Sequence, residues 1–446
     1  MMKTPICDFV EAYVSRHATR LHMPGHKGVA LQGLEDRDIT EIEGADVLYQ
    51  AKGIILESEQ NASLLFGSAK TIYSTEGSSL AIRAMLYLTK LYAMANGQKP
   101  VILATRNVHK SFVYAAALLD IEVEWIDCTS LLTCQLDLVE LKAKLDSLRP
   151  TALYLTSPDY VGHIAPVKEA GMLCHEAGSL LLVDNAHGAY LKYLAPSLHP
   201  MDLEADMCCD SAHKTLPVLT GGGYLHIGKS APKMLCDHAE ESMATFASTS
   251  PSYLILQSLD HVNALLDGPL ASQFKDMAQQ LSAIRDTLEQ HGWETYGTEP
   301  LKLTLCPKPY GYTGQEVATY LAQNDMICEF ADPDYVVLML SPYTTKEALS
   351  RLVRLLCTLS RRTPILSMPP TIQTRTTACA PKDAIFAPKI VVKTKEAEGC
   401  VLAAPSVSCP PAVPVLLCGE VISRDAIESF LYYGIDTLTV LRNENA

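Results

Sequence analysis

One lysine in this sequence stands in a setting that suits covalent chemistry. Lys214 ends the motif Ser211-Ala212-His213-Lys214, which closely follows an apolar run at residues 205–209. Lysine forms a reversible Schiff base with an aldehyde cofactor such as pyridoxal phosphate (PLP), and Ser211 and His213 can donate hydrogen bonds to its phosphate. The short motif by itself is better explained as a surface lysine in a turn, so a PLP site needs support from the rest of the chain.

A second candidate residue is Asp184, which follows the apolar run at residues 180–183. A carboxylate beside a pyridinium nitrogen keeps that nitrogen protonated, and a protonated ring withdraws electrons from the substrate α-carbon. A lone aspartate after a strand is usually a cap, but the pairing of Asp184 with Lys214 is harder to attribute to chance. His109 can stack on the ring and His187 can reach its hydroxyl oxygen, although each histidine alone is better explained as an ordinary solvated or core residue.

A small-residue turn at residues 75–79 is a candidate phosphate site. It joins a short strand expected at residues 71–74 to a helix expected at residues 80–94. The free N–H groups and the positive dipole end of a helix N-terminus bind phosphate, although an ordinary N-cap by Ser78 or Ser79 is the plainer explanation of this turn alone. The loop at residues 22–28 carries two histidines and a lysine around Pro-Gly; we expect a plain turn there and no metal site.

The elements that must position these residues alternate between strand and helix. Strands are expected at residues 71–74, 101–104, 123–126, 151–155, 180–183, 205–209 and 223–227, most of them separated by helices. The strands are apolar without alternation, which predicts a mostly parallel α/β sheet that is buried on both faces. The polar clusters follow the carboxyl ends of strands, where open α/β sheets bind ligands.

The sequence suggests five consecutive regions. They are an N-terminal helix and active-site loop (1–45), a PLP-binding large domain (46–265), a small α+β domain (266–360), a linker (361–388) and a C-terminal segment (389–446). Residues 40–57 are expected to be irregular, with a helix starting at Glu59. Further elements are expected as a helical region at 254–291, strands at 301–306, 335–340, 390–392 and 415–417, a Pro-rich turn at 409–411 and a last helix from Ser423.

Composition narrows the class of protein. The net charge of −14 argues against nucleic acid or an anionic membrane as partner and is weakly compatible with a cationic substrate. The 14 cysteines include no Cys-x-x-Cys spacing, so they indicate buried free thiols in a reducing, cytoplasmic compartment. No apolar run is long enough to span a bilayer, and no signal peptide is evident.

The motifs together resemble the PLP-dependent ornithine/lysine/arginine decarboxylase family of fold type I, the aspartate-aminotransferase fold. They lie at residues 22–28, 44–46, 53–55, 77–79, 106–111, 156–158, 184–188, 211–214, 248–253, Pro410-Pro411 and Gly419-Glu420. The resemblance implies a large domain with a mostly parallel sheet and a smaller C-terminal α+β domain. The first motif begins at His22, so the chain is similar to short members without the N-terminal wing domain.

The resemblance also implies a role for each matching residue. Lys214 would carry the Schiff base, Asp184 would pair with the pyridinium nitrogen and His109 would stack on the ring. The other cofactor-binding residues would be Gly77, Ser78, Ser157, His187, Ser211, His213 and Thr249. Thr249 or Ser250 would reach the cofactor of a neighbouring subunit, because such sites form at a homodimer interface. Glu420 and His26 are weaker candidates for contact with the substrate.

Several residues depart from the family pattern. Glu76 stands where the family usually has Asn, Asn185 replaces a usual Glu, Asp159 a usual Thr, and Cys418 a usual Pro. A carboxylate at Glu76, next to a phosphate-binding turn, is unfavourable unless it points away. These departures leave the choice of substrate open.

The resemblance implies decarboxylation of arginine, lysine or ornithine to the corresponding amine, with a slight preference for arginine or lysine. The α-carbon would be reprotonated by Lys214 or His109. An aminotransferase or β-eliminating lyase of the same fold is an alternative, and so is a catalytically inactive regulatory homologue.

Overall fold

A computed structural model describes residues 2–126, 135–373, 375–405 and 414–442. The chain forms two compact units. The first comprises Met1–Pro100, Leu145–Ser157 and Val167–Lys275, and the second comprises Val101–Lys144, Pro158–Pro166 and Asp276–Ala446. The five sequential regions expected from the sequence remain a prediction.

The main sheet is mostly parallel, as expected, and has seven strands in the described part of the chain. These are β1 (Lys70–Ser74), β2 (Val101–Thr105), β3 (Glu122–Ile126), β4 (Ala152–Thr156), β5 (Leu180–Asp184), β6 (Met207–Asp210) and β7 (Gly223–Ile227). In the first unit the order is β1-β7-β6-β5-β4, with β7 antiparallel to both of its neighbours. The second unit holds the parallel pair β2 and β3.

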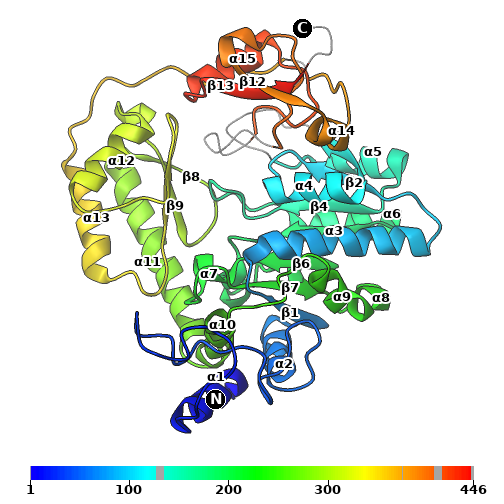
Figure 1. Ribbon diagram of the computed structural model, residues 1–446. Coiled ribbons are helices and arrows are strands. Elements are labelled where there is room, and N and C mark those ends of the chain that lie inside the picture. Colours follow the sequence, from blue (N-terminus) through cyan, green and yellow to red (C-terminus); the bar gives the residue numbers. More distant parts are fainter. Residues whose placement is uncertain (1, 127–134, 374, 406–413, 443–446) are drawn as a thin grey trace. The chain divides into compact units, whose positions relative to one another are not determined.

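Helices of the first unit cover its strands because the strands are apolar throughout: every residue of β5 and β7 is buried. Helix α3 (Gly77–Ala95) packs on β1, β5, β6 and β7, and the ribbon crosses the strands there (Figure 1). Helix α2 (Ile54–Phe66) contacts β1, and α6 (Val167–Ala177) contacts β5. The shorter helices are α7 (Ala212–Thr215), α8 (Lys233–Asp237) and α9 (Ala239–Ala244), with 3-10 turns η1 (Ala189–Tyr193) and η2 (Pro200–Asp202).

The start of α2 corrects the sequence prediction, which placed it at Glu59. The helix begins at Ile54 because the Asp46 carboxylate accepts hydrogen bonds from the N–H groups of Gly53 (2.8 Å) and Ile55 (3.1 Å). Asp46 lies too far back in the sequence for a capping pattern to reveal it.

The expected long helical region at residues 254–291 is two helices. They are α10 (Tyr253–Leu266) and α11 (Leu270–Gln290), and the break falls at Gly268-Pro269, because proline cannot continue a helix. Helix α1 (Pro5–Ser15) buries Ile6 and Val10 and confirms that the chain begins with a helix, as the sequence predicts.

The second unit contains the expected smaller α+β part. A four-stranded antiparallel sheet has the order β10-β11-β9-β8 in the described residues. Its strands are β8 (Glu294–Tyr296), β9 (Lys302–Cys306), β10 (Phe330–Ala331) and β11 (Val336–Met339). The helices of this part are α12 (Gly314–Gln323) and α13 (Lys346–Thr358), with η3 at Lys308–Tyr310. Helix α4 (Lys110–Leu119) joins β2 to β3, and α5 (Leu138–Leu148) precedes β4.

The C-terminal part differs from the prediction in two places. Residues 415–417 form bends and an isolated bridge rather than the expected strand. A strand that was not expected, β13 (Thr437–Leu441), pairs antiparallel with β12 (Lys389–Lys393), because a partner far away in sequence satisfies its backbone. The remaining elements are α14 (Pro381–Phe386), η4 (Thr394–Glu396) and α15 (Arg424–Tyr432). The Pro-rich turn predicted at Cys409-Pro410-Pro411 lies outside the described residues.

Within the ranges that the structure describes, no helix combines the length and the apolar character that crossing a bilayer requires.

Candidate active site

The small-residue turn after β1 brings together residues that are far apart in the sequence. Gly77 has φ +66°, a left-handed conformation, and its N–H donates to the carbonyl of Gly221 (2.6 Å). The N–H of Ser78 donates to Ser211 Oγ (3.3 Å), and Ser211 Oγ donates to Ser78 Oγ (2.9 Å). Gly77, Ser78 and Ser211 therefore meet at the N-terminus of α3, where a helix of this length favours an anion.

Close backbone approach explains two glycines, at and just before the start of β7, that pack against this turn. A Cβ on Gly223 would lie 2.7 Å from the carbonyl oxygen of Asp210 and 3.0 Å from the carbonyl carbon of Gly77. A Cβ on Gly221 would lie 2.8 Å from the carbonyl oxygen of Thr75. The turn is thus a backbone-lined cradle that larger residues would distort.

Lys214 lies on the single turn of α7, directly after Ser211. Its amide donates to the Ser211 carbonyl (3.0 Å), and its Nζ is 3.0 Å from His187 Nε2. His213 Nδ1–H donates to the Gly222 carbonyl (2.8 Å), so its other ring nitrogen donates to an anion only when the ring is protonated. Burial and the nearby Lys214 charge both lower the pKa of His213, and a bound phosphate dianion would oppose that shift.

Asp184 ends β5 and is buried. Its Oδ2 accepts a hydrogen bond from the Tyr154 hydroxyl (3.1 Å), and its Oδ1 accepts from the Ala186 N–H (3.2 Å) and faces the Cys209 thiol at 3.6 Å. Burial, and then the neighbouring Asp184 charge, raise the pKa values of both Tyr154 and Cys209 well above their usual range, so both stay protonated donors. Tyr154 and Cys209 were not predicted from the sequence. Only side-chain alternation along the strands, combined with the register of β4, β5 and β6, could have indicated that they face Asp184.

Two further predicted residues lie in the first unit with different degrees of support. Ser157 follows β4, and its N–H donates to the Asp184 carbonyl (3.0 Å), which places it at the same strand end. Thr249 lies in an exposed loop whose Ser248 N–H donates to Glu76 Oε1 (2.8 Å). The Glu76 carboxylate is thus engaged by this loop, which gives a physical reason for tolerating an acid beside the phosphate turn.

His26 lies in the N-terminal loop of the same unit. Its Nε2 is 3.2 Å from Asp38 Oδ2, and its Nδ1 accepts from the Gly28 N–H (3.0 Å). These contacts are local to the loop, so substrate contact by His26 remains a prediction.

His109 and Glu420 belong to the second unit. His109 caps α4, and its Nδ1 accepts from the Ser111 N–H (3.3 Å). Glu420 makes a bidentate ion pair with Arg106, with Oε1–Nη1 and Oε2–Nη2 distances of 2.7 and 2.8 Å, and both side chains are buried. The N–H of Leu417 also donates to Glu420 Oε2 (2.7 Å), so this carboxylate is fully engaged within its own unit.

The other three residues that depart from the family pattern are Asp159, Cys418 and Asn185, and their surroundings in the fold are as follows. Asp159 Oδ1 accepts from the N–H groups of Val161 (3.0 Å) and His163 (2.8 Å), and burial raises its pKa. Burial raises the pKa of the Cys418 thiol to about 12, so this thiol is unreactive. Asn185 Nδ2 donates to Asp210 Oδ1 (2.7 Å).

The first unit holds a donor set that fits PLP. A lysine amine, a buried carboxylate and a glycine-lined anion cradle lie at the carboxyl ends of β1, β5 and β6. Thr156 and Thr215, next to Ser157 and Lys214, have buried hydroxyls without a hydrogen-bond partner among the described residues, as expected where a polar ligand completes the site.

The fold and this donor set define the class of a fold type I PLP-dependent enzyme. Residues 4–306 match the family model described as "Orn/Lys/Arg decarboxylase, major domain", and the chain therefore belongs to the Orn/Lys/Arg decarboxylase family.

Relatives match over nearly the full chain. The chain is 29% identical to the uncharacterized protein YaaO of Bacillus subtilis, over 96% of this chain and 93% of YaaO. It is 30% identical to an arginine decarboxylase of Halalkalibacterium halodurans, over 95% of this chain and 91% of that protein. An arginine decarboxylase of Bacillus subtilis is 28% identical, over 97% and 94% respectively.

Solved structures share the fold at low identity. The lysine decarboxylase LdcF of Francisella novicida matches with a TM-score of 0.79 and 16% identity, covering 99% of this chain and 81% of its own. Lysine decarboxylase A of Pseudomonas aeruginosa matches with a TM-score of 0.80 and 17% identity, covering 96% and 75%.

Proposed function

We propose that this protein is a PLP-dependent decarboxylase that converts a basic amino acid to its amine and CO₂. The observation that carries the proposal is the set formed by Lys214, Ser211 and Ser78 beside Asp184, at one end of the sheet in a member of this decarboxylase family. When bound, PLP supplies the electron-withdrawing ring that makes loss of CO₂ from an α-amino acid possible.

Different residues of this chain would hold different parts of the cofactor. The Lys214 amine would bond to the aldehyde carbon, Ser78, Ser211 and the N–H groups of α3 would hold the phosphate, and Asp184 would keep a proton on the ring nitrogen. Tyr154 fixes the rotamer of Asp184 by donating to Oδ2, so that Oδ1 keeps its orientation. The family motif implies that His109 would stack on the ring.

Proton transfer falls to Lys214 and His187. The Lys214 ammonium would return the proton to the α-carbon, and a protonated His187, whose Nε2 lies 3.0 Å from Lys214 Nζ, would then replace that proton on the amine.

Arginine is the substrate that we expect first, because relatives that match more than nine-tenths of this chain are named arginine decarboxylases. The net charge of −14 agrees with a cationic substrate. Substrate contact by Glu420 would require Arg106 to be displaced, so another acidic group is the better candidate for the substrate's distal cation. We further propose a cytoplasmic homodimer in which Thr249 reaches the partner's cofactor.

The test uses one preparation of the full chain supplied with PLP. We expect a visible absorbance band that borohydride abolishes, and release of CO₂ from arginine in preference to lysine and ornithine. The variant Lys214→Ala should show neither the band nor CO₂ release. A visible band without CO₂ from any of the three would overturn the proposed reaction and lead to a search for keto-acid products. Absence of the band in the wild-type protein would overturn the role of Lys214.

A further inference from the structure

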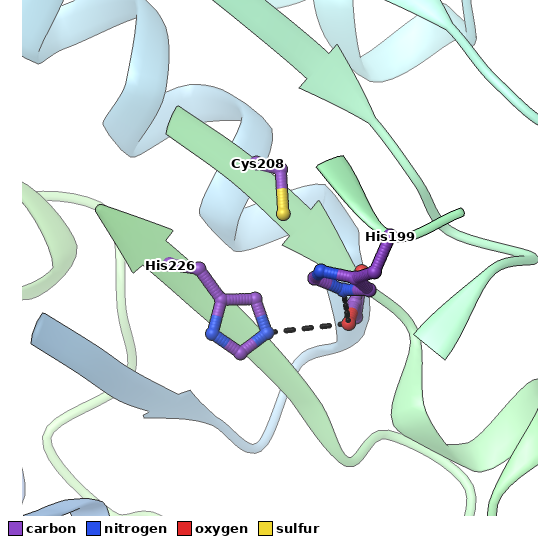
Figure 2. Close-up of side chains that lie close together, drawn as sticks. His199, Cys208 and His226 are labelled. Carbon is purple, nitrogen blue, oxygen red and sulfur yellow. Dashed lines mark hydrogen bonds and ion pairs between the residues drawn. The ribbon is translucent and has the colours of Figure 1, made fainter. Parts of the chain in front are cut away.

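A buried polar cluster lies on β6 directly before the lysine motif. Asp210 Oδ2 accepts hydrogen bonds from His199 Nε2 (3.0 Å) and His226 Nε2 (3.2 Å), and all three side chains have 0% exposure. Figure 2 shows His199 and His226 with dashed lines for their hydrogen bonds, and Cys208 beside them. Asn185 Nδ2 donates to the other oxygen, Oδ1 (2.7 Å), so three N–H donors reach one carboxylate.

The proton positions follow from the neighbours of the histidines. His199 Nδ1 accepts the N–H of Met201 (3.2 Å), so the proton of the neutral ring is on Nε2 and points at Asp210. Burial alone would raise the pKa of Asp210, but His199 and His226 lower it well below its usual range. Asp210 is therefore a buried anion held by N–H donors.

The same hydrogen bond argues against a metal ion in this cluster. A metal on His199 Nε2 would require the proton on Nδ1, where it would face the N–H of Met201. Histidine ligands of metals normally donate their second N–H to an acceptor, and here that position is taken by a donor. Hydrogen bonds to Asp210 explain why the nitrogen atoms of His199 and His226 lie so close to its carboxylate.

Strand alternation places this anion opposite the cofactor-binding residues. Cys209 faces the Asp184 carboxylate, so its neighbours Cys208 and Asp210 point to the other face of the sheet. His226 belongs to β7, opposite Cys208 in the register, and His199 precedes η2. The anchors of Asp210 thus come from three separate segments: the turn after β5, the start of η2 and β7.

We propose that Asp210 is a positioning residue that fixes the end of β6 and thereby the Ser211–Lys214 segment that holds PLP. This inference rests on the proposed function. Asp210 is bonded directly to Ser211, whose hydroxyl meets Ser78, so a shift of the strand end moves both the phosphate site and Lys214. The network also accounts for Asn185: a glutamate there would set a second carboxylate against Asp210, whereas the amide donates to it.

The test is Asp210→Asn, which keeps the size of the side chain but removes the charge and one acceptor. The N–H of His199, which Met201 fixes, would then lose a charged acceptor, so we expect PLP affinity to fall by about tenfold to a hundredfold. The rise in Tm that PLP causes should shrink accordingly, because that rise depends on the dissociation constant of PLP. Asn185→Ala removes one donor and serves as the milder variant if Asp210→Asn does not fold, with an expected loss of PLP affinity of about threefold to tenfold.

The matched control is Asp260→Asn. Asp260 is also a buried carboxylate of the first unit, and it accepts from the N–H groups of Ile6 and Cys7 (both 2.9 Å), far in sequence from the lysine motif. We expect this variant to lower Tm with and without PLP by the same amount. If Asp210→Asn behaved in the same way, with unchanged PLP affinity, the network would be structural only and the proposal would be wrong.

One further result would overturn the proposal independently of the reaction. One equivalent of tightly bound metal in the wild-type protein, lost in Asp210→Asn, would show that the cluster is a metal site. Since PLP affinity and Tm do not require turnover, they test Asp210 even if the chain decarboxylates none of the three amino acids. Failure of the proposed function instead appears as PLP binding without CO₂ release by the wild-type protein.

Discussion

Two buried aspartates, one strand apart, show how opposite faces of one sheet edge take on different tasks. Asp184 ends β5, and its carboxylate accepts hydrogen bonds from one hydroxyl, one N–H and, at a longer distance, one thiol. Asp210 ends β6 and receives three N–H donors, two of them from histidines. A carboxylate with weak neutral donors can still bind a protonated ring nitrogen, whereas one saturated by N–H groups belongs to the scaffold. Burial alone does not separate the two roles; the donor set does.

The largest expected effect is that of replacing Asp184, the aspartate on the cofactor face of the sheet. Asp184→Ala should lower kcat by about a thousandfold, because the anion that holds the ring proton is lost. PLP should still react with Lys214, so the borohydride-sensitive band should persist in an absorbance spectrum. A kcat within threefold of the wild-type value would contradict the assignment, and the much smaller effect expected for Asp210→Asn provides the comparison.

The second prediction concerns Glu420. Its carboxylate, like that of Asp210, accepts hydrogen bonds from three N–H groups, so we expect it to stabilise the fold. Glu420→Gln removes the charge that pairs with the buried Arg106 guanidinium, so the free energy of unfolding should fall by about 3 kcal/mol. Denaturant unfolding measures this loss. Glu428→Gln, at the exposed pair with Arg424, is the control and should cost less than about 1 kcal/mol. A large rise in KM for arginine with unchanged stability would instead support substrate binding by Glu420.

The third prediction concerns pH. The pKa of Asp210 is lowered in the folded state, so its contribution to stability is present above the unfolded-state pKa of about 3.9 and is lost as pH falls towards the folded value. The difference in free energy of unfolding between the wild-type protein and Asp210→Asn should therefore narrow below about pH 4. A difference that stays constant from pH 7 to pH 3 would show that Asp210 is not the buried anion described above.

His226 acts in a higher pH window. Burial lowers its pKa, so the unfolded chain binds a proton there first, and stability should begin to fall as pH drops below about 6.5. Comparing His226→Gln with the wild-type protein between pH 7.5 and 5 would isolate this contribution.

The smallest expected effect is that of replacing Tyr154, the hydroxyl donor to Asp184. Tyr154→Phe removes one hydroxyl donor and leaves the Asp184 charge, so kcat should fall by about twofold to fivefold, the size of one neutral hydrogen bond. Steady-state kinetics with the preferred substrate measures it. A fall comparable with that of Asp184→Ala would mean that the hydroxyl does more than orient the carboxylate.

The sequence by itself determined the class of fold, because apolar strands without alternation predict a buried parallel sheet. It also indicated Lys214, just after such a strand, and Asp184, at the end of another, as candidate catalytic residues, and their roles stay a prediction. The start of α2 and the pairing of β13 with β12 were missed, because Asp46 and β12 are distant partners that no local pattern reveals. Pattern also led to a strand at residues 415–417 that the structure does not form.

Only the tertiary structure decided what the individual polar residues contact. Strand register sets Tyr154 and Cys209 against Asp184, and three distant segments converge on Asp210. The tertiary structure also shows that Glu76 accepts a hydrogen bond from the Ser248 N–H and that Glu420 pairs with Arg106. Neither contact can be predicted from residue type or spacing. The physical reason is that a side chain's charge is a local property, whereas its partners depend on which strands and turns lie beside it after folding.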